Sequence, residues 1–159
     1  MSDDDVRDHI VRVLTWHDAH ASFDDAVTGL PVELRGRRPT GLPYSPWQLL
    51  EHLRRAQADL LDFCVNPDYV ELTWPDDYWP EADAPPDAHA WDASVAAFHR
   101  DRAALVALAR DASVDLTAAI PHGTGQTYLR EILLAVDHNA YHVAELVVAR
   151  RLLGAWPPG

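Results

Sequence analysis

The sequence contains one cysteine and no lysine among its 159 residues. The single thiol, Cys64, cannot form an intramolecular disulfide, so nothing in the chain requires an oxidising compartment. We expect Cys64 to be a small core residue. The chain starts with the acidic segment MSDDDVRD, whereas the first part of a secretory signal peptide is basic. These absences predict a cytoplasmic location.

Cations are scarce: the 13 basic residues are all arginine, against 25 acidic residues, which gives a formal net charge of −12. Phosphate recognition needs clustered cations, and the sequence has no basic run, so we expect no nucleic-acid partner. No apolar run reaches about 18 residues, the length that spans a bilayer, so no membrane span is predicted. Small molecules and metal cations remain as expected partners. The lysine-free, alanine- and aspartate-rich composition indicates a bacterial origin with a GC-rich genome.

No segment shows the alternating pattern of a β-strand, which predicts an all-α protein. The length fits a single domain over residues 1–159, large enough to bury about 70% of the surface of its unfolded chain. Helical spacing of apolar residues, caps and prolines predict four helices, which we expect to form a four-helix bundle. They run from Ser2 to about Leu30, from Ser45 to about Asn66, from after Asp87 to about Ala112, and from after Gly125 to Gly154.

A long loop is predicted between the second and third helices, NPDYVELTWPDDYWPEADAPPDA. Loops of this length are usually functional or disordered, and the aromatic residues argue against disorder. We therefore expect the loop to cover one end of the bundle and to wall a pocket in which Trp74 and Trp79 contact a substrate. A loop that only covers the bundle end would explain the same residues.

The fourth predicted helix carries His138 and His142, which are four residues apart and therefore share one face. The rest of this face is apolar and expected to be buried: Leu134, Ala135, Ala149 and Leu153. The opposite face is apolar as well: Val136, Ala140, Val143 and Val147. A bundle helix needs only one buried face, so the second favours a homodimer, although wide contact with the core would explain it too.

A third histidine, His52, lies on the second predicted helix within the apolar stripe of Leu49, Ala56, Leu60 and Phe63. Each of three buried imidazoles needs a polar partner, and one divalent metal would satisfy all three. We therefore predict a metal site formed by His52, His138 and His142. The alternative is three core histidines with separate hydrogen bonds. Imidazole ligands favour Zn²⁺, Ni²⁺ or Fe²⁺ over Mg²⁺, and three protein ligands leave a coordination position open for catalysis.

Two further residues of the last helix are candidates for proton transfer. Glu145 lies on the histidine face. It is a candidate for one of three roles: acceptor of a hydrogen bond from an imidazole, general base, or fourth metal ligand. The structural alternative is an ion pair with Arg150 or Arg151. Tyr141 lies at the flank of this face and is a candidate hydrogen-bond donor or a packing residue. Asp59 is a weaker candidate of the same kind as Glu145. The orientation of His17 and His20 is ambiguous, and surface or capping roles are expected for His9, His89, His99 and His122.

Three segments together, SPWQLLEHLRRAQ, WPDDYWP and TYLREILLAVDHNAYHVAELVVARRLLGAWP, resemble the DinB-like family of bacterial four-helix proteins. This resemblance implies a divalent metal held by one histidine of the second helix and two of the fourth, which correspond to His52, His138 and His142. The family frequently has glutamine where this chain has Glu145, so the site would gain a negative charge here.

The same superfamily includes transferases and isomerases that depend on low-molecular-weight thiols such as bacillithiol and mycothiol, and members with no known reaction. The resemblance thus suggests an enzyme in which a thiolate or a hydroxide attacks a small electrophile. A non-catalytic, stress-related dimeric metal protein is the alternative. A di-iron oxidase is disfavoured because no histidine has a carboxylate three residues before it, and a zincin protease because HNAYH lacks the glutamate of HExxH.

Overall fold

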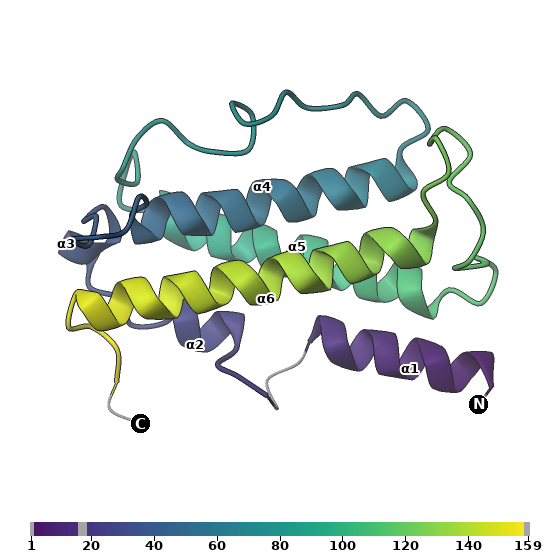
Figure 1. Cartoon of the computed structure of the whole chain (residues 1–159), viewed down its shortest axis with the longest axis horizontal. Coiled ribbons are helices and arrows are strands. Elements are labelled where there is room, and N and C mark those ends of the chain that lie inside the picture. Colours follow the sequence, from purple (N-terminus) through teal and green to yellow (C-terminus); the bar gives the residue numbers. More distant parts are fainter. Residues whose placement is uncertain (1, 16–18, 158–159) are drawn as a thin grey trace.

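The structure is a computed structural model that describes residues 2–15 and 19–157. These residues form six helices and no strand, which confirms the predicted all-α class. The helices are α1 (Asp3–Leu14), α2 (Phe23–Val27), α3 (Val32–Arg35), α4 (Pro46–Val65), α5 (Ala90–Arg110) and α6 (Tyr128–Leu152). The long helices α4, α5 and α6 run side by side (Figure 1). The shorter helices α1 and α2 follow one another along the lower side of the molecule in this view, and both contact α6.

The prediction of one continuous first helix was wrong. α1 ends at Leu14, and α2 starts anew after Ser22, whose side chain accepts a hydrogen bond from the backbone N–H of Asp25. The carboxylate of Asp25 accepts in turn from the backbone N–H of Ser22, which completes a capping box. The apolar spacing runs on across the break, because α1 and α2 each bury one face and both pack against α6, although in different clusters of the core. Periodicity alone therefore did not reveal it.

The other three predicted helices are present within a few residues of their expected bounds. α4 begins at the Ser45–Gln48 capping box with Pro46 in its first turn, as its start signal predicted. α6 is capped by the Thr127 side chain, which accepts from the backbone N–H of Arg130. Strong local caps thus fix where these helices begin.

The core consists of two clusters of buried side chains, one around α2, α4, α5 and α6, the other around α1, α5 and α6. Val143 and Val147 of α6 are buried in the first cluster. The face that favoured a dimer partner is therefore covered within the chain, because α1 and α2 pack against α6. The exposed apolar residues of α6 lie elsewhere and include Leu134, Tyr141 and Val148.

α6 differs from expectation in one respect. By length and composition it is apolar enough to cross a membrane, with a mean hydropathy of 1.2 over an 18-residue window, of which 33% is buried in the fold. The absence of a membrane span therefore stays a prediction. Core helices of globular proteins pass the same test, and α6 packs against α4 along its length.

The segment 66–89 between α4 and α5 contains no helix and passes over α4 (Figure 1). Side chains of α4 hold it in place. Arg55 donates to the carbonyl oxygens of Asp77 (3.1 Å) and Trp79 (3.3 Å). Asp59 accepts from the phenol of Tyr78 at 2.7 Å. Together these contacts fix residues 77–79 beside the middle of α4.

Candidate metal centre

His52 lies in the middle of α4 and is only 2% exposed. The Nδ1–H of its ring donates to the carbonyl oxygen of Tyr78 at 3.2 Å. Trp79 stacks on the ring, with the two ring centres 3.8 Å apart and the planes 7° from parallel. Both contacts come from the segment that crosses α4, so this segment fixes both the tautomer and the orientation of the imidazole.

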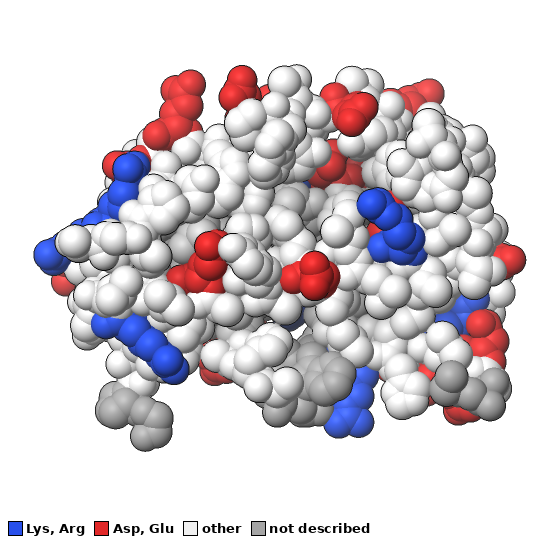
Figure 2. Space-filling view, in the orientation of Figure 1, with Lys and Arg blue, Asp and Glu red and all other residues white. Residues whose placement is uncertain are grey.

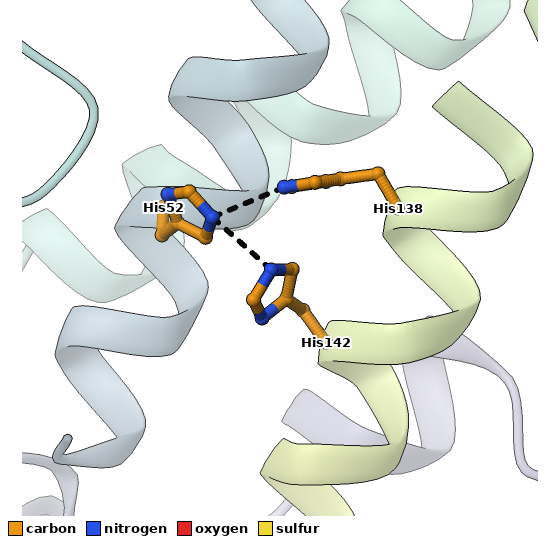
Figure 3. A group of neighbouring side chains, drawn as sticks. All are labelled: His52, His138 and His142. Carbon is orange, nitrogen blue, oxygen red and sulfur yellow. Dashed lines mark hydrogen bonds between the residues drawn. The ribbon is translucent and has the colours of Figure 1, made fainter. Parts of the chain in front are cut away.

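His138 and His142 lie one turn apart on α6 and point toward His52 (Figure 3). The Nε2 atom of His52 is 3.0 Å from Nε2 of His138 and 3.1 Å from Nε2 of His142. The three candidate ligand atoms all lie within 4.8 Å of one another. Two nitrogen ligands of a tetrahedral ion, each with a bond of about 2.1 Å, are themselves separated by about 3.4 Å. The spacing of the rings fits a shared cation.

The outer nitrogens explain why a cation suits this centre. The Nδ1–H of His142 donates to Oε2 of Glu145 at 2.7 Å, just as Nδ1 of His52 donates to a carbonyl. In the neutral form of each ring, the proton is then on Nδ1 and Nε2 carries a lone pair. Two lone pairs that face each other at 3.1 Å repel, whereas a cation between them attracts both. The hydrogen-bond pattern therefore prepares both imidazoles as metal ligands.

Burial keeps two of the rings neutral. Burial first, and repulsion from His142 second, lower the pKa of His52 to about 4. The pKa of His138 is also lowered to about 4, by burial first and by His142 second. Among the described residues, Nδ1 of His138 is buried without a hydrogen-bond partner. Neutral imidazoles at neutral pH bind metal ions without first losing a proton.

A cavity of about 570 Å³ opens at this centre between α4, α6 and the crossing segment. Figure 2 shows a hollow in the surface between α6 and the segment that crosses α4, and acidic side chains along the upper edge of the molecule in this view. His52 and His138 line the cavity, and the other side chains in its wall include Asp59, Phe63, Tyr69, Glu71, Trp74, Tyr78, His122, Arg130 and Glu131. Two of the three candidate metal ligands, His52 and His138, thus face a space that a small molecule can enter.

The two predicted substrate contacts take different places. Trp74 is 67% exposed and lines the cavity, with its ring centre 6.2 Å from that of His52. Trp79 is half-buried between His52 and Tyr44, on which it also stacks at 3.8 Å. Trp79 therefore packs behind the imidazole, and Trp74 is the tryptophan placed to contact a ligand.

The two candidates for proton transfer lie on the side of the candidate metal ligands that faces away from this cavity. Glu145 contacts His142 and lines a separate groove with Tyr141 and Tyr44. Tyr141 is 63% exposed. The geometry gives Glu145 the role of acceptor from a histidine, one of the alternatives that its spacing left open. Neither residue lines the cavity that His52 and His138 face.

The remaining histidines are spread over the molecule. The ring of His99 pairs with Asp24 at 2.8 Å, and that of His122 contacts the carbonyl oxygen of Phe63 at 2.8 Å. His122 also lines the cavity, which the sequence did not predict. His17 lies outside the described residues. Cys64 is buried, as expected, and burial raises the pKa of its thiol to about 12, which keeps it protonated.

The sequence did not identify the residues that support the centre from outside. Tyr78 acts through its carbonyl oxygen on His52 and through its phenol on Asp59. A backbone carbonyl has no signature in a sequence. Asp59, which the sequence marked as a weaker candidate for proton transfer, accepts from both Tyr69 and Tyr78 and so holds the crossing segment.

Comparison with known proteins gives one finding. The family model described as the DinB superfamily matches residues 9–146, a range that contains all three converging histidines. No match is found among the curated proteins or among the solved structures.

Proposed function

The chain belongs to the DinB superfamily, and on this basis we propose that it is a divalent-metal-dependent enzyme that transfers a low-molecular-weight thiol to a small electrophile. The closeness of the three imidazoles carries the proposal: Nε2 of His52 lies 3.0 Å from Nε2 of His138 and 3.1 Å from Nε2 of His142. His52, His138 and His142 would hold Zn²⁺, Ni²⁺ or Fe²⁺. A bound divalent cation lowers the pKa of a thiol or water that it coordinates and so supplies a nucleophile at neutral pH.

The residues of the chain would bind and orient the reactants. The cavity opens on His52 and His138 and is large enough for a small molecule. Its aromatic wall, which includes Trp74 and Tyr78, favours an apolar electrophile and limits the entry of water. Glu145 would hold the Nδ1 proton of His142 and keep Nε2 directed at the metal. A hydrolase would use the same ligands, but the aromatic part of the wall favours the thiol reaction.

Metal content tests the first half of the proposal. Protein purified without a histidine tag should contain about one transition metal per chain. The double variant His138→Ala with His142→Ala should contain none, because it removes two of three ligands. His9→Ala, an exposed histidine on α1, is the matched control and should keep the metal. Full metal content in the double variant would refute the assignment.

Conjugation tests the second half. We expect the metal-loaded protein to accelerate the reaction of low-molecular-weight thiols with monochlorobimane, followed by fluorescence. A chelator should abolish the acceleration, and the double histidine variant should lack it. A metal-loaded protein that accelerates no conjugation, or does so equally with chelator present, would favour the non-catalytic metal protein instead.

Assembly and location belong to the same proposal. We propose a cytoplasmic homodimer that binds small molecules and has no nucleic-acid or membrane partner. The exposed apolar side chains of Leu134, Tyr141 and Val148, seven residues apart on α6, support an interface between two copies. Sedimentation equilibrium of the native protein and of Tyr141→Glu distinguishes a dimer from a monomer.

A further inference from the structure

The cavity extends beyond the metal ligands to Glu131, two turns closer to the start of α6. Glu131 is only 2% exposed, although it lines the cavity. Its Oε1 atom accepts from Nη1 of Arg130 at 2.6 Å. Among the described residues, no hydrogen bond reaches its Oε2 atom. Oε2 is not sealed off from solvent, so it is open to the cavity and can accept a hydrogen bond from a ligand there.

The surroundings of Glu131 favour a cationic donor. Arg130 is the one cation among the described residues that line the cavity, and it is already paired with Glu131. Two further carboxylates, Asp59 and Glu71, line the same space. Aromatic rings form much of the wall, and their faces attract cations. These rings are Phe63, Tyr69, Trp74 and Tyr78. An ammonium group therefore finds both a charged acceptor and aromatic surface.

The spacing along α6 separates the two ends of such a ligand. Glu131 and His138 are seven residues apart, which is about 10 Å along the helix axis. Both side chains line the cavity, so a ligand that contacts both has to extend over several bonds.

We propose that the cavity selects a thiol that carries a primary amine, with the ammonium group donating to Oε2 of Glu131 while the sulfur reaches the metal. This inference rests on the proposed function and names the class of thiol that it uses. Glu131 is then a specificity-determining residue, since it contacts the end of the ligand that does not react.

Two thiols with the same four-carbon chain, one with a terminal amine and one without, test the inference on the cobalt(II)-loaded protein. Binding of 4-aminobutane-1-thiol and of butane-1-thiol is followed by the near-ultraviolet absorption band of a cobalt thiolate. We expect the aminothiol to bind the native protein about 10-fold more tightly, the typical effect of one charged hydrogen bond. Glu131→Gln should remove this preference and leave the affinity for butane-1-thiol unchanged. Asp137→Asn, an exposed carboxylate of α6 outside the cavity lining, should keep the preference.

The outcomes separate this inference from the proposed function. Equal affinities in the native protein, together with a clear thiolate band, would overturn the inference alone. A preference that survives in Glu131→Gln would do the same. If neither thiol produces the band, the proposed function fails and the inference fails with it. Should circular dichroism show that Glu131→Gln is unfolded, Glu131→Asp replaces it: the charge remains, so the aminothiol preference must remain as well.

Discussion

Removing the acceptor behind His142 should weaken metal binding without removing a metal ligand. Glu145 accepts from Nδ1 of His142 at 2.7 Å, and its side chain is 34% exposed. Loss of such a supporting acceptor typically costs about 10–100-fold in metal affinity, or about 1.4–2.7 kcal/mol. Solvent screening of a partly exposed carboxylate places this site at the lower end. We therefore expect Glu145→Ala to bind Zn²⁺ about 10-fold more weakly than the native protein.

The assay is competition for Zn²⁺ with a chromophoric chelator at fixed pH. Glu145→Gln retains an acceptor oxygen but loses the charge, so its affinity should lie between those of the native protein and of Glu145→Ala. Glu33→Ala removes an exposed carboxylate on α3 and serves as the control for the change in net charge. Equal Zn²⁺ affinity for Glu145→Ala and the native protein would refute the idea that this carboxylate supports the metal ligand.

Three further predictions follow from other contacts. In the folded, metal-free protein the pKa values of His52 and His138 are near 4, below the usual 6.5. The unfolded chain therefore binds more protons between these values, and the free energy of unfolding should fall as the pH drops from about 6.5 toward 4. Urea unfolding with a chelator at a series of pH values checks this, and a free energy of unfolding that does not change with pH would contradict it. Trp74→Ala should speed the dissociation of a small molecule from the cavity, measured by stopped-flow, and should leave the metal bound, measured by elemental analysis. An unchanged dissociation rate would show that Trp74 does not contact the bound molecule. Arg150 is 2% exposed and donates to carbonyl oxygens of α2 and of Ala155. Arg150→Met should therefore lower the free energy of unfolding by about 2–4 kcal/mol. A variant whose thermal midpoint equals that of the native protein would contradict this prediction.

Much of the candidate centre was visible in the sequence because helices obey a fixed geometry. The spacing of four residues between His138 and His142 places both rings on one face of α6 in any helix. The position of His52 within an apolar stripe predicted that it points inward. The structure brings the three imidazoles together, which requires only that α4 and α6 be neighbours in the core.

The sequence did not predict the contacts between segments that lie far apart along the chain. Trp74 and Trp79 looked equivalent in the predicted loop, yet one lines the cavity and the other stacks behind His52. Their difference depends on how Arg55 and Asp59 hold the crossing segment against α4. Such contacts join residues about 20 positions apart through side chains and carbonyls, and no local pattern encodes them.

The sequence by itself determined the helical class, the caps that start α4 and α6, and the face on which each histidine lies, because these depend on neighbours within a turn or two of the chain. Only the tertiary structure decided the tautomers of His52 and His142, the cavity beside them and the exposure of Glu131 to it. These properties arise from the packing of separate segments, whose relative placement is set by the whole core and not by any one stretch of residues.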